Sequence, residues 1–368
     1  MASSNTKTAH RSILASEAAV PKDLLPPPGS IAILPTDDPF YSYHVKNILD
    51  NVPGAKVEEL SKDTRAIVWL DVRGPPAAER LGKILDDNPQ IGWVQLCQAG
   101  INNIVPLFER HGKKVWTSAK GSFGQPVAEH ALMLTLSLLR NLPKRVRATS
   151  WGTPSGISLF GQRVTLVGAG GISLSLISLL EPFNVKVTVL RRKAEPLDPS
   201  AVPSSFKDGE NLIVRSFKEL HSVLPETDVL VIAAALTPDT RNMIGEKELA
   251  LLPQNAVLVN VARGELVDTD ALTASLRKGS FAGAGLDVTA PEPLPADHPL
   301  WSLQRDSGAS FDKELEPDQK GNLIITPHTA DTPDMIAPLL AARFARNAKA
   351  LLDGKGAFEG LVDTVNGY

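Results

Sequence analysis

The sequence predicts an α/β protein with two domains, each built around a parallel β-sheet. At 368 residues the chain is long for one hydrophobic core, which favours two domains. Short apolar runs alternate with helix-length segments along most of the chain, a pattern typical of parallel sheets. At 162–173, one such run passes directly into a glycine turn and then into an expected helix.

The first domain is expected to begin after a disordered tail. Residues 1–29 are rich in Ala, Ser and Pro and lack the apolar core of a secretory signal. From residue 30 onward we expect strands at 31–34, 66–70 and 93–96 and helices at 43–49 and 77–85. The segment 98–103 follows the third strand at its carboxyl end, where open α/β sheets bind ligands, although an ordinary turn is the alternative.

A long apolar helix at 127–139 is expected to bridge the domains, with the boundary near 120–125. We interpret His130 on this helix as a packing residue rather than a catalyst. The remaining expected elements are strands at 163–167, 185–190, 229–233, 256–261, 282–288 and 323–326, and a final helix at 335–352.

The glycine turn is a candidate dinucleotide site. Gly168 would make the turn, and Gly170 would let a pyrophosphate approach the main chain at the N-terminus of the next helix. Ser173 replaces the third glycine of G-x-G-x-x-G, a position that needs only a small residue because the helix packs on the strand there. Glycine turns also occur for purely structural reasons, so the motif alone leaves both interpretations open.

Three charged or titratable residues, Arg263, Glu292 and His328, each follow a predicted strand of the second domain. In one parallel sheet they would lie on the same edge as the glycine turn. An Arg can bind a carboxylate or polarise a carbonyl, a His can donate a proton, and a carboxylate can raise the pKa of that His. Hydride transfer to a 2-oxo acid requires this combination, whereas each residue alone could equally be a surface charge or a cap.

The residues at the end of the strand at 185–190, the next strand after the glycine turn, indicate which cofactor binds. NAD sites usually carry an Asp or Glu about 20 residues past the first glycine, to bind the ribose 2′-hydroxyl. This chain instead has Arg191, Arg192 and Lys193 there, and an Arg fork suits a 2′-phosphate. NADPH is therefore expected, with NADH possible, and solvated loop charges are the alternative.

Composition excludes other classes of function. The net charge of -3 gives no reason to expect nucleic acid, and no apolar run is long enough to span a membrane. The single cysteine, Cys97, excludes an internal disulfide and is consistent with a cytoplasmic protein. No metal-ligand spacing such as C-x-x-C or H-E-x-x-H occurs, so no metal is expected.

From about residue 94 to 352 the chain resembles the D-isomer-specific 2-hydroxyacid dehydrogenase family. The motifs include Ala-Gly-Ile-Asn-Asn at 99–103, Val-Ala-Glu-His at 127–130, Leu-Thr-Pro-Asp-Thr-Arg at 236–241 and Val-Asn-Val-Ala-Arg-Gly-Glu-Leu-Val-Asp at 259–268. Thr-Pro-His at 326–328 completes them, and the run at 283–295 is most similar to the glyoxylate/hydroxypyruvate reductase branch.

The resemblance implies two Rossmann-like domains. The NAD(P)-binding domain at 123–328 would be inserted between two parts of the substrate domain, 30–122 and 329–368, and the protein would be a homodimer. It also implies reduction of glyoxylate or hydroxypyruvate with Arg263, Glu292 and His328 as catalytic residues. Substrate would also contact the backbone of Ala99 and Gly100. The cofactor residues expected are Gly168, Gly170, Gly171, Ile172, Arg191, Arg192, Thr237, Ala262 and Asp287, of which Asp287 would bind the nicotinamide carboxamide.

Two rival functions share this fold. Some relatives resembling the family serve as nucleotide-sensing corepressors and scaffolds, for which this sequence offers no basic patch or extra domain. Formate dehydrogenases resemble the fold but carry Gln where Glu292 stands, so an intact His–Glu pair points to a keto acid. The segment 305–321 is longer than the family's usual connection, and we interpret it as a solvated loop.

Overall fold

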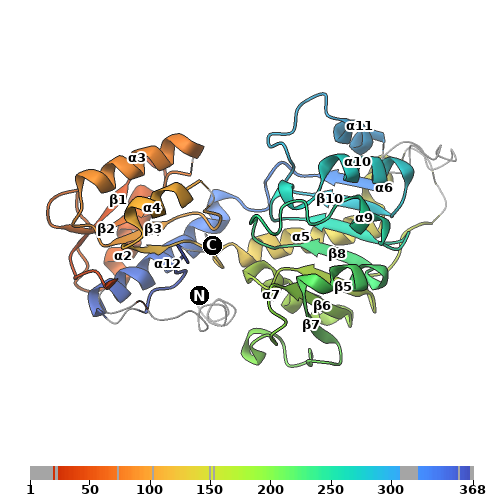
Figure 1. Cartoon of the computed structure of the whole chain (residues 1–368), viewed down its shortest axis with the longest axis horizontal. Coiled ribbons are helices and arrows are strands. Elements are labelled where there is room, and N and C mark those ends of the chain that lie inside the picture. The colour runs from red at the N-terminus through yellow and green to blue at the C-terminus, as the bar shows by residue number, and fades with distance from the viewer. Residues whose placement is uncertain are drawn as a thin grey trace. The chain divides into compact units, whose positions relative to one another are not determined.

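The computed structural model describes residues 20, 24–72, 74–101, 103–148, 151, 154–306, 322–354 and 357–364. It divides into two compact units, and the second, Gly124–Asp331, is inserted between the two segments of the first, Met1–Phe123 and Thr332–Tyr368 (Figure 1). Most of the predicted tail at 1–29 and of the segment at 305–321 lies outside the described residues.

The first unit contains a four-stranded parallel sheet in the order β1-β2-β3-β4. These strands are β1 (Ser30–Leu34), β2 (Thr64–Trp69), β3 (Trp93–Leu96) and β4 (Val115–Thr117). The helices of this unit are α2 (Tyr41–Asn51), α3 (Gly74–Asp87), α4 (Phe108–His111) and α12 (Pro333–Asp353). In Figure 1 the C-terminal helix α12, in blue, packs among the orange elements of the N-terminal segment.

Helices cover both faces of this sheet. Successive residues of a strand point to opposite faces, and here they belong to two different core clusters. Ala66 and Val68 of β2 pack with α2 and α12, whereas Ile67 and Trp69 pack with α3 and α4. Upstream of β1, Val20 is buried in the first of these clusters and Leu24 packs against it. The packed chain therefore begins before residue 30, where the sequence predicts that order starts.

The second unit contains a seven-stranded parallel sheet in the order β11-β10-β9-β8-β5-β6-β7. Its strands are β5 (Arg163–Val167), β6 (Lys186–Arg191), β7 (Leu212–Ser216), β8 (Val229–Ile232), β9 (Val257–Asn260), β10 (Gly283–Leu286) and β11 (Asn322–Ile325). Chain order reverses on the two sides of β5, which makes this strand the switch point where doubly wound folds bind ligands. All strand pairs are parallel, so the predicted α/β class is confirmed.

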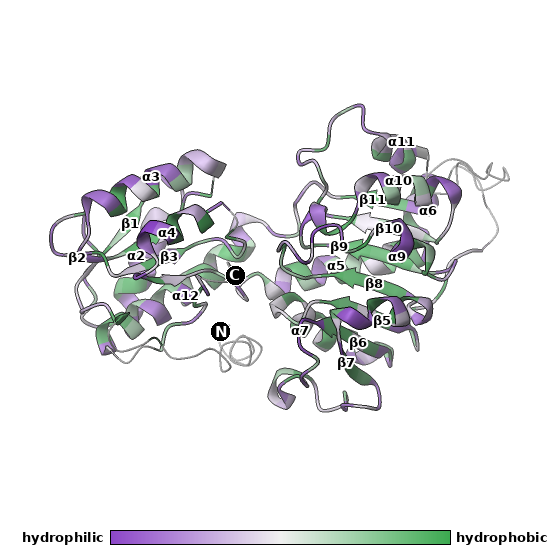
Figure 2. Cartoon of the chain, viewed as in Figure 1, coloured by the Kyte–Doolittle hydropathy of each residue, from purple (hydrophilic) through white to green (hydrophobic). Residues whose placement is uncertain are grey.

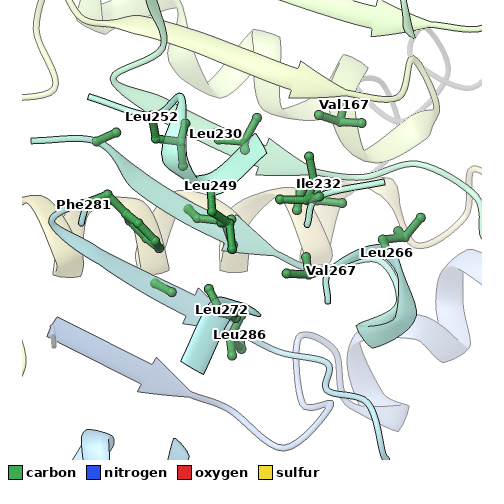
Figure 3. Packing of buried hydrophobic residues seen from close by; sticks show 14 of the residues in the cluster. Val167, Leu230, Ile232, Leu249, Leu252, Leu266, Val267, Leu272, Phe281 and Leu286 are labelled. Carbon is green, nitrogen blue, oxygen red and sulfur yellow. The ribbon is translucent and has the colours of Figure 1, made fainter. Parts of the chain in front are cut away.

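Helices cover both faces of this sheet, which explains why its strands are continuous apolar runs. On one face lie α5 (Gly124–Leu139) and α7 (Gly171–Leu180), and Gly285 of β10 faces Leu134 and Leu138 of α5. The other face packs against α8 (Leu220–Val223), α9 (Glu246–Ala250), α10 (Thr269–Lys278) and α11 (Pro299–Asp306). Figure 3 shows part of that core, with Ile232, Leu249, Leu272 and Leu286 among its labelled side chains. Figure 2 shows hydrophobic residues concentrated in the strands.

Candidate active site

The carboxyl edge of the seven-stranded sheet collects the loops that follow β5, β8, β9, β10 and β11. Because every strand pair is parallel, these loops leave the sheet at one edge. They carry the glycine turn and, in the other loops, Thr237, Arg263, Glu292 and His328. The predicted gathering of these residues at one edge of one sheet is therefore observed.

The glycine turn is built as its sequence predicts. Gly168 has a φ of +111°, and a Cβ there would lie 2.6 Å from the carbonyl oxygen of Ala233, so a side chain would both strain and clash. Gly170 is different: its φ is −84° and a Cβ would meet no atom within 4 Å. Space is therefore open above Gly170, the N-cap of α7, where Gly171 and Ile172 begin the helix.

The environment of Ser173 explains why a serine can replace the third glycine of the motif. It is fully buried, and its hydroxyl donates a 2.8 Å hydrogen bond to the carbonyl oxygen of Gly168. The buried hydroxyl therefore has a hydrogen-bond partner inside the helix–strand contact, and the same bond stabilises the turn.

His328 and Glu292 form the shortest contact among the predicted catalytic residues. His328 Nδ1 lies 2.6 Å from Glu292 Oε1, and Glu292 Oε2 accepts a longer hydrogen bond of 3.4 Å from the Thr289 amide. With the carboxylate ionised, Nδ1 carries a proton and donates it, so Nε2 is the ring nitrogen left to face a reactant. Both side chains are about half exposed, so solvent or a ligand can reach them.

The pair shifts both pKa values. The hydrogen bond to Glu292 raises the pKa of His328 above its ordinary value, against opposing effects of partial burial and of the Arg263 charge. In return, the hydrogen bond from His328 lowers the pKa of Glu292, and the Arg263 charge lowers it further. The pair therefore stabilises an ionised Glu292 carboxylate beside a protonated His328 imidazole.

Arg263 lies in the loop directly after β9, close enough for its charge to act on His328 and Glu292. Its Nη1 donates to the Ala262 carbonyl at 2.7 Å. Buried Asn260 shapes this loop, since its side chain donates to the Arg263 carbonyl and accepts from the Ala262 amide. The structure thus brings all three predicted catalytic side chains together.

Asp287 is buried at the end of β10, where its carboxylate holds the β11 loop. Oδ1 accepts from the Thr326 hydroxyl at 2.7 Å and from the Thr329 amide at 2.9 Å, and Oδ2 accepts from the Ala330 amide at 3.2 Å. Burial alone would raise its pKa, but hydrogen bonds from His130, Thr326 and Thr329 outweigh burial, and the pKa is lowered. Asp287 is therefore ionised and firmly bound to the chain that carries His328.

His130, interpreted from sequence as a packing residue, belongs to this cluster. Its Nε2 lies 2.8 Å from Thr326 Oγ1 and 3.4 Å from Asp287 Oδ1. Sequence reasoning missed the contact because Thr326 is 196 residues away along the chain. The packing of helix α5 against strands β10 and β11 brings His130 and Thr326 together.

The other predicted cofactor residues flank the glycine turn along the same edge. Arg191 ends β6, and its Nη1 donates to the Glu195 carbonyl at 3.2 Å; Arg192 follows it on the surface. The Thr237 amide donates to the Thr240 hydroxyl within the turn after β8. Ala262 is buried beside Arg263.

The two predicted substrate residues outside this sheet, Ala99 and Gly100, belong to the first unit. They follow β3 in a half-buried loop. Gln98 holds that loop by donating to Asn103 Oδ1 at 2.6 Å, while its carbonyl accepts from the Ala119 amide. Their contact with the substrate carboxylate stays a prediction.

The described part of the chain contains no group of three or more His, Cys, Asp or Glu side chains that could hold a metal ion. It also contains no helix with the length and apolarity that crossing a membrane requires.

A doubly wound sheet with a glycine turn and an Arg–Glu–His cluster at its carboxyl edge defines a nucleotide-dependent oxidoreductase as the class of protein. Residues 130–330 match the model of the NAD-binding domain of the D-isomer specific 2-hydroxyacid dehydrogenase family. The chain belongs to this family, as the resemblance predicts. It is therefore an enzyme that interconverts 2-oxo acids and D-2-hydroxy acids with NAD(P).

Individual proteins are similar to this chain over most of its length. An uncharacterized protein from the proB 3′ region of Corynebacterium melassecola is 32% identical over 76% of this chain and 84% of its own. A glyoxylate reductase from Thermofilum pendens is 29% identical over 74% of this chain and 75% of its own.

Solved structures share the fold. A D-isomer specific 2-hydroxyacid dehydrogenase from Xanthobacter autotrophicus, in complex with NADPH, aligns with a TM-score of 0.73 at 24% identity over 93% of this chain and all of its own. An NADPH-dependent glyoxylate/hydroxypyruvate reductase from Sinorhizobium meliloti, in complex with NADP, aligns with a TM-score of 0.68 at 20% identity, over 92% of this chain and all of its own.

Proposed function

We propose that the protein reduces glyoxylate or hydroxypyruvate to the corresponding 2-hydroxy acid with NADPH. The observation that carries this proposal is the 2.6 Å His328–Glu292 contact, beside Arg263, on the sheet edge that bears the glycine turn. The choice of a small oxo acid is supported by the motif run at 283–295 and by the glyoxylate reductases among the relatives.

In this proposal His328 is the proton donor. Its Nε2–H faces the carbonyl oxygen and transfers a proton as the alkoxide develops, while Glu292 stabilises the imidazolium through Nδ1. Arg263 binds the substrate carboxylate or polarises the carbonyl, since its planar fork matches both groups. The backbone amides of Ala99 and Gly100 receive the carboxylate. Bound reduced nicotinamide supplies the hydride.

The glycine turn fits a dinucleotide. The open space above Gly170 admits a pyrophosphate, and the first amides of α7, from Gly171 and Ile172, offer it donors. Thr237, Ala262 and Asp287 line the nicotinamide end in this assignment. Asp287 Oδ2 accepts one described hydrogen bond, so it retains capacity to accept from the carboxamide.

NADPH is the proposed cofactor because no carboxylate ends β6. Arg191 and Arg192 stand there instead and would bind the 2′-phosphate. The complexes of the Xanthobacter and Sinorhizobium proteins with NADPH and NADP support this choice.

A substrate panel tests the function. Purified protein, without any partner, is assayed with NADPH and with NADH against glyoxylate, hydroxypyruvate, pyruvate and phenylpyruvate, and with NADP and formate. We expect the highest kcat/KM with glyoxylate or hydroxypyruvate and NADPH. A higher value for phenylpyruvate would contradict the substrate, and formate oxidation would contradict the use of the His–Glu pair. Failure to turn over any oxo acid would favour the corepressor or scaffold alternative.

We further propose a homodimer, acting in the cytoplasm. Support for the dimer comes from apolar side chains exposed on and after α5, namely Met133, Leu142, Val146, Trp151 and Phe160. In this proposal a second copy of the chain covers them. Sedimentation analysis of the wild type and of a Val146→Asp/Phe160→Asp variant tests this: the variant should be monomeric, and a monomeric wild type would contradict the proposal.

A further inference from the structure

His130 is placed by α5 so that its ring reaches the loop that carries His328. Its side chain is 13% exposed, and Nε2 lies 2.8 Å from the hydroxyl oxygen of Thr326. The same nitrogen lies 3.4 Å from Asp287 Oδ1. A histidine that only filled space in a helix–sheet contact would not need two polar partners, one after β10 and one after β11.

The direction of the hydrogen bonds follows from proton counting. The Thr326 hydroxyl has one proton, and it lies 2.7 Å from Asp287 Oδ1, an ionised acceptor. Thr326 Oγ1 must therefore accept from His130, which places a proton on Nε2. The chain runs from His130 through Thr326 to Asp287, and each donor points toward the buried charge.

Asp287 in turn fixes the backbone around His328. Its carboxylate accepts from the amides of Thr329 and Ala330, and its main-chain oxygen accepts from the His328 amide at 2.7 Å. His328 has a φ of +52°, in the left-handed region that a non-glycine residue rarely adopts. The bonds to Asp287 hold this conformation, from which the ring meets Glu292.

We infer that His130 is a positioning residue for the reaction: through Thr326 and Asp287 it holds His328 in contact with Glu292. The inference rests on the proposed role of His328 as proton donor. The charged groups that act on His328 are Glu292, Arg263, Asp287 and Asp331, and His130 acts on Asp287 and Asp331 in turn. Loss of His130 should therefore change the position of the His328 imidazole by altering the conformation of the loop at 326–330.

Two substitutions separate hydrogen bonding from packing. His130→Gln keeps an N–H donor near the position of Nε2, whereas His130→Ala removes it. Thr326→Val removes the middle of the chain without changing side-chain volume, so it tests the same link if the alanine variant folds poorly. Thr135→Val is the matched control, because Thr135 is a buried residue of α5 whose hydroxyl bonds only within the helix, to the Ala131 carbonyl, in the described structure.

The first readout is the pKa of His328, followed by NMR from its Cε1 proton and assigned with a His328→Gln variant. We expect this pKa to fall toward the ordinary value in His130→Ala and Thr326→Val, and to keep the wild-type value in His130→Gln and Thr135→Val. An unchanged pKa in both His130→Ala and Thr326→Val would overturn the inference. This titration needs no turnover, so it stands even if no oxo acid proves to be a substrate.

The second readout is steady-state reduction of glyoxylate. In His130→Ala we expect kcat to fall roughly 10–100-fold, as for other residues that orient a functional group, with a much smaller change in KM. His130→Gln should recover most of kcat. If Gln is no better than Ala, or if Thr135→Val lowers kcat equally, then His130 acts by packing alone and the inference is wrong.

Discussion

Glu292 and His328 lie 36 residues apart in sequence, yet Glu292 Oε1 and His328 Nδ1 are separated by 2.6 Å. The loops after the neighbouring strands β10 and β11 present them to each other. Two supports keep the contact in place: the Thr289 amide holds the other oxygen of Glu292, and the main chain of Asp287 holds the His328 amide. The proposed proton donor and its partner are thus held by backbone as well as by side-chain hydrogen bonds.

The two glycines of the turn should respond to substitution in different ways. Gly168→Ala forces a Cβ against the Ala233 carbonyl at a positive φ, so we expect the free energy of unfolding to fall by about 2 kcal/mol or more. Gly170→Ala meets open space and should leave the melting temperature unchanged, but its methyl group should weaken cofactor binding. Thermal unfolding and cofactor titration of both variants check this. Equal stability of the two would contradict it.

Substitution of Arg263 should affect binding and chemistry together. In the proposed function Arg263 acts on substrate in both the ground state and the transition state, so KM should rise and kcat should fall in Arg263→Ala. We expect kcat/KM to drop roughly 10²–10³-fold. Arg277→Ala, an exposed arginine on α10, serves as the control and should behave as wild type. Wild-type kcat/KM in Arg263→Ala on every oxo acid tested would refute the assignment.

Cofactor preference should depend on the carboxyl end of β6. In the Arg191→Ala/Arg192→Ala variant, we expect kcat/KM for NADPH to fall roughly 10–100-fold, the value of one or two charge-assisted hydrogen bonds, with little change for NADH. Lys186→Ala, an exposed cation at the amino end of the same strand, is the matched control. A wild type that prefers NADH, or a double variant with intact NADPH preference, would exclude this role.

Much of the second unit could be predicted from the sequence because its strands and its glycine turn are specified by short stretches of neighbouring residues. Apolar runs flanked by turn residues give β5, β8 and β9, and the glycine turn follows from the conformational freedom that Gly168 uses. The short strand β4 and the outermost strand β7 were not predicted. β4 is only three residues long, and β7 is an edge strand with one buried residue, Leu212, and only three consecutive apolar residues, so neither gives a strong strand signal.

The candidate site was predictable only in part, for a physical reason. Strand ends bring Arg263, Glu292 and His328 to one edge, and that follows from parallel pairing alone. The contact of His130 with Thr326 depends on how α5 lies across β10 and β11, and no periodicity within a helix reveals which face meets a strand end. The hydrogen bond from the Ser173 hydroxyl to the Gly168 carbonyl likewise could not be predicted, because it depends on the three-dimensional path of the turn.

The pH dependence of reduction in Glu292→Gln tests the central claim most directly. In the proposed mechanism reduction requires a protonated His328, so we expect kcat/KM to decline as pH rises through the pKa of that group. Contact with the Glu292 carboxylate raises this pKa. Gln keeps a hydrogen-bond acceptor for Nδ1–H but removes the charge, so the pKa should fall and the decline should begin at a lower pH than in the wild type. Glu265→Gln, at a partly exposed carboxylate beside Arg241, gives the control profile. We predict an acidic shift of the decline in Glu292→Gln alone; a profile in that variant identical to the wild type would contradict the His328–Glu292 mechanism.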